Sequence, residues 1–90
     1  MRHVLEHNDR WERILGNAVA SFTERMALIL FTPMADRTHT IAVNPDIGVP
    51  DISFAEADLL PHIGNTLVER LDLVTAAQYG VETVYLLERP

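Results

Sequence analysis

The sequence predicts a small α+β domain in which a three-stranded antiparallel sheet carries both of its helices on one face. Residues 11–22 place apolar side chains at helical spacing, and a second helical pattern begins near Ser53. Residues 38–43 and 81–88 are rich in the β-branched and apolar side chains that favour strands. We therefore expect the order helix, strand, strand, helix, strand, in a single domain over residues 1–90.

The first helix is expected to start after Asn8 or Asp9, since either side chain can cap a helix. An apolar stripe runs along it, formed by Trp11, Ile14, Leu15, Ala18, Val19 and Phe22. The stripe faces one side of the helix, so we expect this side to pack on the sheet.

Residues 25–32 are apolar on every side, and periodicity alone does not distinguish a buried strand from a continued helix there. We expect a strand, because residues 38–43 need a partner and residues 33–37 suit a hairpin loop between the two. The alternative is a mostly α protein with one long helix over residues 9–31 and a two-stranded sheet.

The second half of the chain is expected to contain one loop, one helix and one strand. Two X-Pro steps and Gly48 predict a loop over residues 44–52. Ser53 and Glu56 match a capping box, and the helix is expected to run toward Gln78. Its stripe comprises Leu59, Leu60, Ile63, Leu67 and Leu71, and Gly80 is expected to end it. A right-handed crossover then places the last strand beside the first, in sheet order 2-1-3.

The composition excludes several classes of function. The 90 residues hold 13 acidic and 7 basic side chains, a net charge of −6, which disfavours nucleic-acid binding. No cysteine and no lysine is present, so thiol and Schiff-base catalysis and a phosphate-loop lysine are absent. No secretion signal or membrane span is recognisable, and we expect a cytoplasmic protein without cofactors or catalytic residues.

One short pattern suggests metal chemistry. The residues His3-Val4-Leu5-Glu6-His7 match H-x-x-E-H, the spacing of the inverzincin metalloproteases, which would put His3 and His7 on one helical face. The resemblance covers five residues, and no downstream carboxylate ligand is evident. We therefore expect a solvated first turn here and no metal site.

A polar cluster is the candidate site for a small ligand. Arg37 can clamp an anion and His39 can act as a base, with His62 and Asn65 on the second helix beside them. This cluster supports one alternative function, a small-ligand-binding protein or minor enzyme with a polar pocket near Arg37, His39 and His62.

The leading hypothesis is a non-enzymatic protein-interaction module, a homodimeric regulator, adaptor or inhibitor that binds another protein. A three-stranded sheet leaves one face and two edges open, and self-association covers such edges. A further alternative is an accessory subunit of a larger complex. The apolar residues expected at the interface are Trp11, Met26, Phe31, Ile47, Val49 and Ile52.

Overall fold

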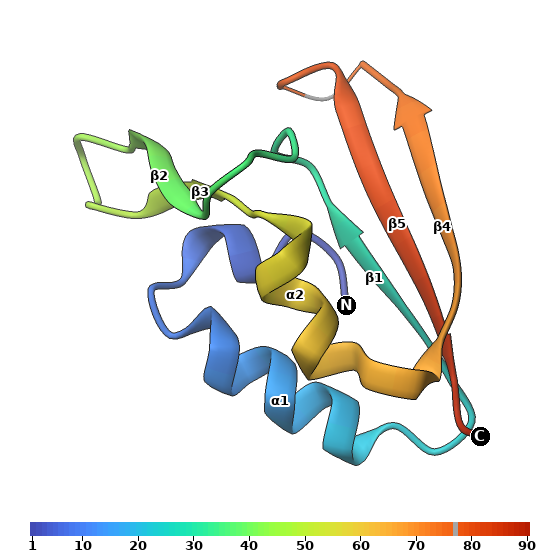
Figure 1. The fold of residues 1–90 in the computed structure, drawn as a ribbon. Helices are drawn as coiled ribbons and strands as arrows, with labels where there is room; N and C mark the ends of the chain where they lie inside the picture. The colour runs from blue at the N-terminus through green and yellow to red at the C-terminus, as the bar shows by residue number, and fades with distance from the viewer. Residues whose placement is uncertain (77) are drawn as a thin grey trace.

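The computed structural model describes residues 1–76 and 78–90. These residues form, in order, η1 (Leu5–His7), α1 (Trp11–Ser21), β1 (Arg25–Leu30), β2 (His39–Val43), β3 (Pro50–Ser53), α2 (Glu56–Ile63), η2 (Gly64–Thr66), β4 (Leu67–Val74) and β5 (Val81–Glu88). Here η marks a 3₁₀ helix. Strands β1, β5 and β4 form an antiparallel sheet in that order. Both α-helices lie on one side of this sheet (Figure 1), which confirms the expected α+β class.

The residues of β1 form a strand, so the alternative of one long helix over residues 9–31 is wrong. The chain leaves α1 at Phe22 with an extended backbone, at φ −72° and ψ 146°. β1 then pairs with β5 in a register that sets Leu28 opposite Tyr85. The last strand therefore lies beside the first, as expected.

The core lies between the helices and the inner face of the sheet. Alternation along a strand sends every second side chain to the same face, and Leu28 and Tyr85 on the inner face are both 0% exposed. The cluster of buried apolar residues is Leu5, Trp11, Leu15, Leu28, Leu30, Ile52, Phe54, Leu59, Ile63, Tyr85 and Leu87. It takes residues from both helices and from both halves of the chain.

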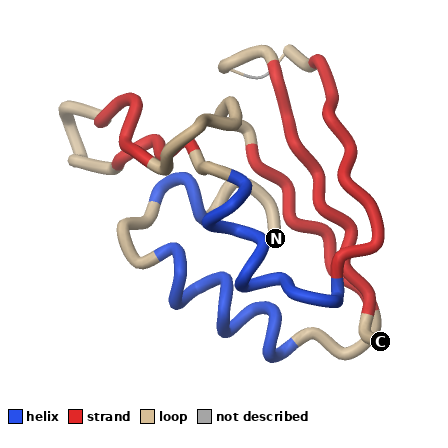
Figure 2. The backbone as a smooth tube through the Cα atoms, viewed as in Figure 1, coloured by secondary structure: helices blue, strands red, loops and turns tan. Residues whose placement is uncertain are grey.

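The expected partner of residues 38–43 is wrong, and so is the expected sheet order. β2 pairs with β3, which lies in the segment expected to be a loop, and the two form a separate two-stranded sheet that projects to one side (Figure 2). Gly48, at φ +67°, permits the reversal between them. Its amide donates to the carbonyl of Asn44 at 2.8 Å. A short local hairpin thus replaces the longer-range pairing with β1.

The second helix is much shorter than expected, and the capping box is wrong. α2 ends at Ile63, where Gly64 takes a φ of +53°. Its N-cap is Ala55, without a side-chain bond, while Ser53 belongs to β3. Residues 67–74, expected as helix, form β4, and Gly80 lies in the turn from β4 to β5 at φ +75°. Residue 77, also within the expected helix, lies outside the described residues.

One edge of the sheet is covered by the first residues of the chain. The amide of Ile29 donates to the carbonyl of Met1 at 2.9 Å, and the amide of His3 donates to the carbonyl of Ile29 at 3.0 Å. Arg2 forms a parallel bridge to Ile29. The β1 edge is therefore paired along part of its length, and β4 forms the opposite, open edge.

Two adjacent leucines of α2 test the position of the core. Leu59 is 0% exposed and Leu60 is 39% exposed, although the sequence stripe included both. Leu59→Ala should lower the free energy of unfolding by about 2–5 kcal/mol, because it leaves a cavity in the core. Leu60→Ala should cost less than half as much. Urea denaturation measures both, and equal losses would contradict this assignment of the core.

Candidate interaction surface

The outer face of the sheet, on the side away from the helices, carries rows of apolar side chains, in which Val84 is 8% exposed and Leu71 is 36% exposed. Strand register places Ile29, Val84 and Leu71 in one row across β1, β5 and β4. Ala27 and Leu86 lie in the neighbouring row. On β1 and β5 the neighbouring side chains Leu28 and Tyr85 point into the core, so these side chains lie on the other face of the sheet. We define the outer face by the apolar residues Ala27, Ile29, Leu71, Leu73, Val84 and Leu86.

The most exposed large apolar side chains of the sheet belong to β4. Val68 is 62% exposed, Leu73 is 45% exposed and Leu71 is 36% exposed. Every residue of β4 after Leu67 is classed as exposed. Exposed apolar side chains on an open edge strand are typical of a surface that binds another chain.

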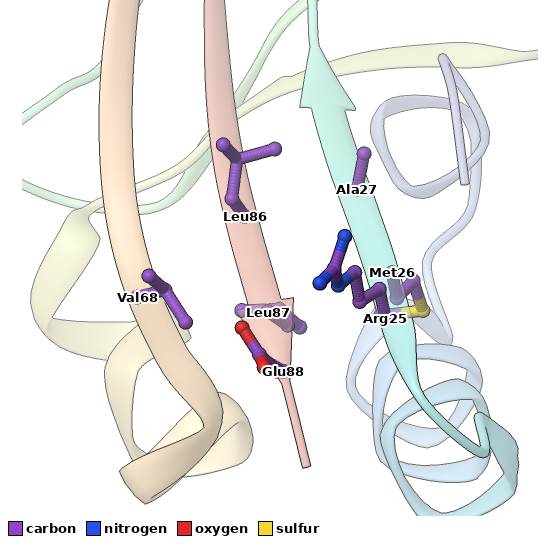
Figure 3. A pocket seen from close by; sticks show the side chains of 7 residues that line it. All are labelled: Arg25, Met26, Ala27, Val68, Leu86, Leu87 and Glu88. Atoms are coloured by element: carbon purple, nitrogen blue, oxygen red, sulfur yellow. The ribbon is translucent and has the colours of Figure 1, made fainter.

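A hollow of about 410 Å³ crosses the sheet near the start of β4. Figure 3 shows that its side chains come from all three strands. The lining residues are Arg25, Met26, Ala27, Val68, Leu86, Leu87 and Glu88. Arg25 and Glu88 are opposite one another in the β1–β5 register. The hollow is thus apolar with one charge of each sign among its lining residues, and it can accept an apolar side chain of a partner.

A network of charged and polar side chains follows β4 on the opposite, helix-bearing face. Nη1 of Arg70 lies 2.8 Å from Oε1 of Glu56, and Nη2 lies 2.9 Å from Oδ1 of Asp72. The guanidinium also lies 5.9 Å from the centre of the Tyr85 ring. The hydrogen bond to Asp72 is the main cause that raises the pKa of Arg70 above its ordinary value. The edge strand therefore carries a fixed cation and a fixed anion two residues apart.

The residues expected at an interface are distributed over several places. Trp11 and Phe31 are each 7% exposed and Ile52 is 5% exposed, so these side chains are buried within the chain. Met26 is half-buried and lines the hollow described above. Ile47, which is 69% exposed, and Val49 line a second hollow of about 520 Å³ beside the β2–β3 turn.

The expected polar pocket is only partly assembled. Nδ1 of His39 lies 2.6 Å from the carbonyl oxygen of Arg37, and both residues are exposed in the approach to β2. His62 lines a hollow of about 470 Å³ between the N-terminal end of α1 and the side of α2, with Nε2 3.6 Å from Oε2 of Glu12. Asn65 is exposed in η2. The lining of this hollow includes His62 but not the other three predicted ligands.

Thr38, rather than its neighbours Arg37 and His39, connects this region to α2. Its hydroxyl donates to Oδ2 of Asp58 at 2.5 Å and accepts the amide of Ala55 at 2.9 Å. The side chain therefore holds the approach to β2 against the start of α2. The polar character of residues 37–40 was visible in the sequence, but the partner of Thr38 was not.

The H-x-x-E-H segment is not a solvated helical turn, which corrects that expectation. His3 has φ +52° and Glu6 is 0% exposed. Oε2 of Glu6 accepts the backbone amide of Phe31 at 2.7 Å. Burial raises the pKa of the Glu6 carboxyl above its ordinary value, although the bond from Phe31 opposes this shift. Glu6 thus anchors the N-terminal segment to the end of β1.

Phe31 is the centre of an aromatic cluster that the sequence analysis missed. Its ring centre lies 5.0 Å from that of His3, 5.4 Å from that of His7 and 5.7 Å from that of Tyr79. The hydroxyl of Tyr79 donates to Oδ2 of Asp51 at 2.6 Å, and this bond is the main cause that raises the pKa of Tyr79 to about 12. Nδ1 of His7 lies 3.2 Å from the other oxygen of Asp51. These contacts join the N-terminal segment, β3 and the β4–β5 turn.

Comparisons of the chain with models of protein families, with curated proteins and with solved structures found no match. Within residues 1–76 and 78–90, no helix is long and apolar enough to cross a membrane. In the same residues, no three metal-ligating side chains form a group that could hold a metal ion. The geometry of the surface is therefore the basis for a function.

The buried carboxyl of Glu6 predicts a pH-dependent stability. Its pKa is higher in the folded chain than the ordinary 4.5, so above about pH 4.5 the folded chain binds more protons than the unfolded chain. This contribution is fully present below that pH and is lost as the pH rises through the folded pKa. The Glu6→Gln variant lacks the ionisation and should gain stability relative to the wild type as the pH rises.

Urea denaturation at pH 4.5, 6 and 7.5 measures the difference between the two proteins, in which the other titrating groups largely cancel. Glu24→Gln, at an exposed position, is the control for the loss of one negative charge. The assignment is contradicted if the free energy of unfolding of Glu6→Gln minus that of the wild type stays constant or falls with increasing pH.

Proposed function

We propose that the chain is a non-enzymatic protein-interaction module, a small homodimeric regulator, adaptor or inhibitor that binds another protein through the outer face of its sheet. The observation that supports this function best is the set of exposed apolar side chains on the edge strand β4, where Val68 is 62% exposed, Leu73 is 45% exposed and Leu71 is 36% exposed. A second observation is the hollow of about 410 Å³ beside it. Protein interfaces combine an apolar centre with such recesses for anchoring side chains.

The charge of the chain suits a protein partner of a particular kind. Its net charge is −6, which favours association with a partner whose surface is basic around an apolar centre. A chain without cysteine is suited to a reducing compartment, and we propose a cytoplasmic location. The same surface would serve an accessory subunit of a larger complex, where the partner is the rest of that complex.

Binding of a small ligand near Arg37, His39 and His62 is a second proposal. The hollow lined by His62, Thr38 and Asp58 supports it. Arg37, the expected anion clamp, lies outside that lining. Arg37→Ala should leave function unchanged under the main proposal, whereas His62→Ala should abolish ligand binding under the alternative. Isothermal titration with a candidate ligand separates the two.

Alanine-to-glutamate substitutions test the outer face directly. Ala27 is half-buried and lines the hollow, whereas Ala42 is exposed on β2, away from the main sheet. Ala27→Glu should weaken binding of the partner by roughly tenfold or more, because it places a charge in an apolar recess. Ala42→Glu, the matched control, should bind as the wild type does.

The measurement is affinity capture from a native cell lysate, followed by titration of the captured protein against both variants. Circular dichroism verifies that both variants are folded. The proposal fails if Ala27→Glu binds as well as Ala42→Glu, or if the wild type captures no protein.

A further inference from the structure

The open edge of the sheet, along β4, is where another strand can pair with this chain. β4 is eight residues long and contains no proline, so its outward backbone groups can pair with a neighbouring strand. The opposite edge, along β1, is already bonded to residues 1–3. A partner that extends this sheet by strand addition therefore has one long open edge, β4, as its docking site.

We propose that β4 pairs antiparallel with β4 of a second copy of this chain, in the register that sets Leu71 opposite Leu71. The inference deepens the proposed function and rests on it, since it names how the homodimer builds its binding face. The two copies then share one continuous sheet, with the strands in the order β1-β5-β4-β4-β5-β1. This arrangement has the two-fold symmetry of the commonest protein dimers.

The charges on β4 favour this register. In a symmetric antiparallel pair, the two-fold axis must pass between two copies of the same residue. Any other register would set a side chain from one face of the sheet opposite a side chain from the other face. A centre at Glu69, Arg70 or Asp72 would set that charge directly opposite its own copy, which destabilises a strand pair. The centre at Leu71 sets Arg70 opposite Asp72 of the second copy, and does so twice.

The apolar side chains agree with the same register. Leu71 ends the outer-face row that begins at Ile29 and passes through Val84. Pairing Leu71 with Leu71 of the second copy joins the two rows into one apolar band across both sheets.

The helix-bearing face contributes a cation that is already held in place and an anion bonded to it. Arg70 is held by Glu56 and by the Tyr85 ring, and Asp72, whose side chain is 65% exposed, is bonded to Arg70. Because Arg70 is already held, its cross-copy pair costs less side-chain entropy than a pair of two flexible surface side chains would. Charge complementarity and apolar burial therefore favour the same occupant, a second copy.

Cysteine cross-linking tests the register, because the natural chain has no cysteine. In the proposed dimer the two residues 71 lie directly opposite, with Cα atoms about 4.5–5.5 Å apart, within the range that a disulfide spans. The two residues 73 lie about 13 Å apart along the strands, too far for a disulfide. With oxidised glutathione, Leu71→Cys should form a covalent dimer at least tenfold faster than Leu73→Cys.

Leu73→Cys is a matched control, since both leucines are exposed on the same face of β4. Light scattering after gel filtration of the wild type should give the mass of a dimer. Equal cross-linking rates for the two variants, or a wild type that is monomeric at 100 µM (roughly the concentration at which a weak dimer would still form), would overturn the inference.

Charge reversal provides an independent test. Arg70→Asp and Asp72→Arg should each weaken the dimer by roughly tenfold or more, because like charges then meet across the two-fold axis. An equimolar mixture of the two variants should form a heterodimer, since each acidic pair then meets a basic pair. Circular dichroism verifies folding, because Arg70→Asp also loses the bond to Glu56. Folded variants that fail to associate when mixed would overturn the register.

The two proposals fail in different ways. A monomeric wild type that still loses its protein partner on Ala27→Glu refutes the strand pairing and the homodimer, and leaves partner binding through the outer face intact. A dimer with rapid Leu71→Cys cross-linking that captures no other protein refutes the partner-binding function and leaves the strand pairing intact.

Discussion

The pairing of β1 with β5 is the constraint on which the rest of the molecule depends. It joins residues 25–30 to residues 83–88, so the two ends of the chain must meet before the sheet exists. On its inner face it sets Leu28 against Tyr85 beneath both helices. On its outer face it aligns Ile29 with Val84. Each further strand takes its place from this pair, because β4 can add only to the free side of β5.

The two edges of the sheet, β1 and β4, differ in how much of the chain packs beside them. The helices, the N-terminal segment and the polar contacts of Glu6 and Arg89 all gather on or beside the β1 side. Arg89 donates from Nε to the carbonyl of Phe22 at 2.8 Å, and its guanidinium lies 4.1 Å from the centre of the Phe22 ring. These contacts tie the end of β5 to the end of α1. On β4, Arg70 bonds to Glu56 of α2, whereas the apolar side chains of Val68, Leu71 and Leu73 stay exposed and are available for contacts with another chain.

Much of the fold could be predicted from local patterns, and the failures share one cause. The stripe that begins at Trp11 and the last strand were recognisable because each repeats over many residues at one period. Leu67 and Leu71 fit the helical spacing of Leu59 and Ile63, yet they belong to a strand. Gly64, with its positive φ, ends the helix between the two groups. Leucines at that spacing also suit a strand, and only the pairing with β5 decides between the two.

The sequence by itself determined the α+β class, the absence of thiol and amine nucleophiles, the acidic charge and the strand character of residues 81–88. Composition and short-range periodicity are local properties, so they need no knowledge of the fold. Only the tertiary structure decided that β2 pairs with β3, that Glu6 is buried against Phe31, and that β4 forms the open edge. Each of these depends on groups that lie far apart in the chain or that compete for the same partner. A local sequence pattern does not determine which partner is bound.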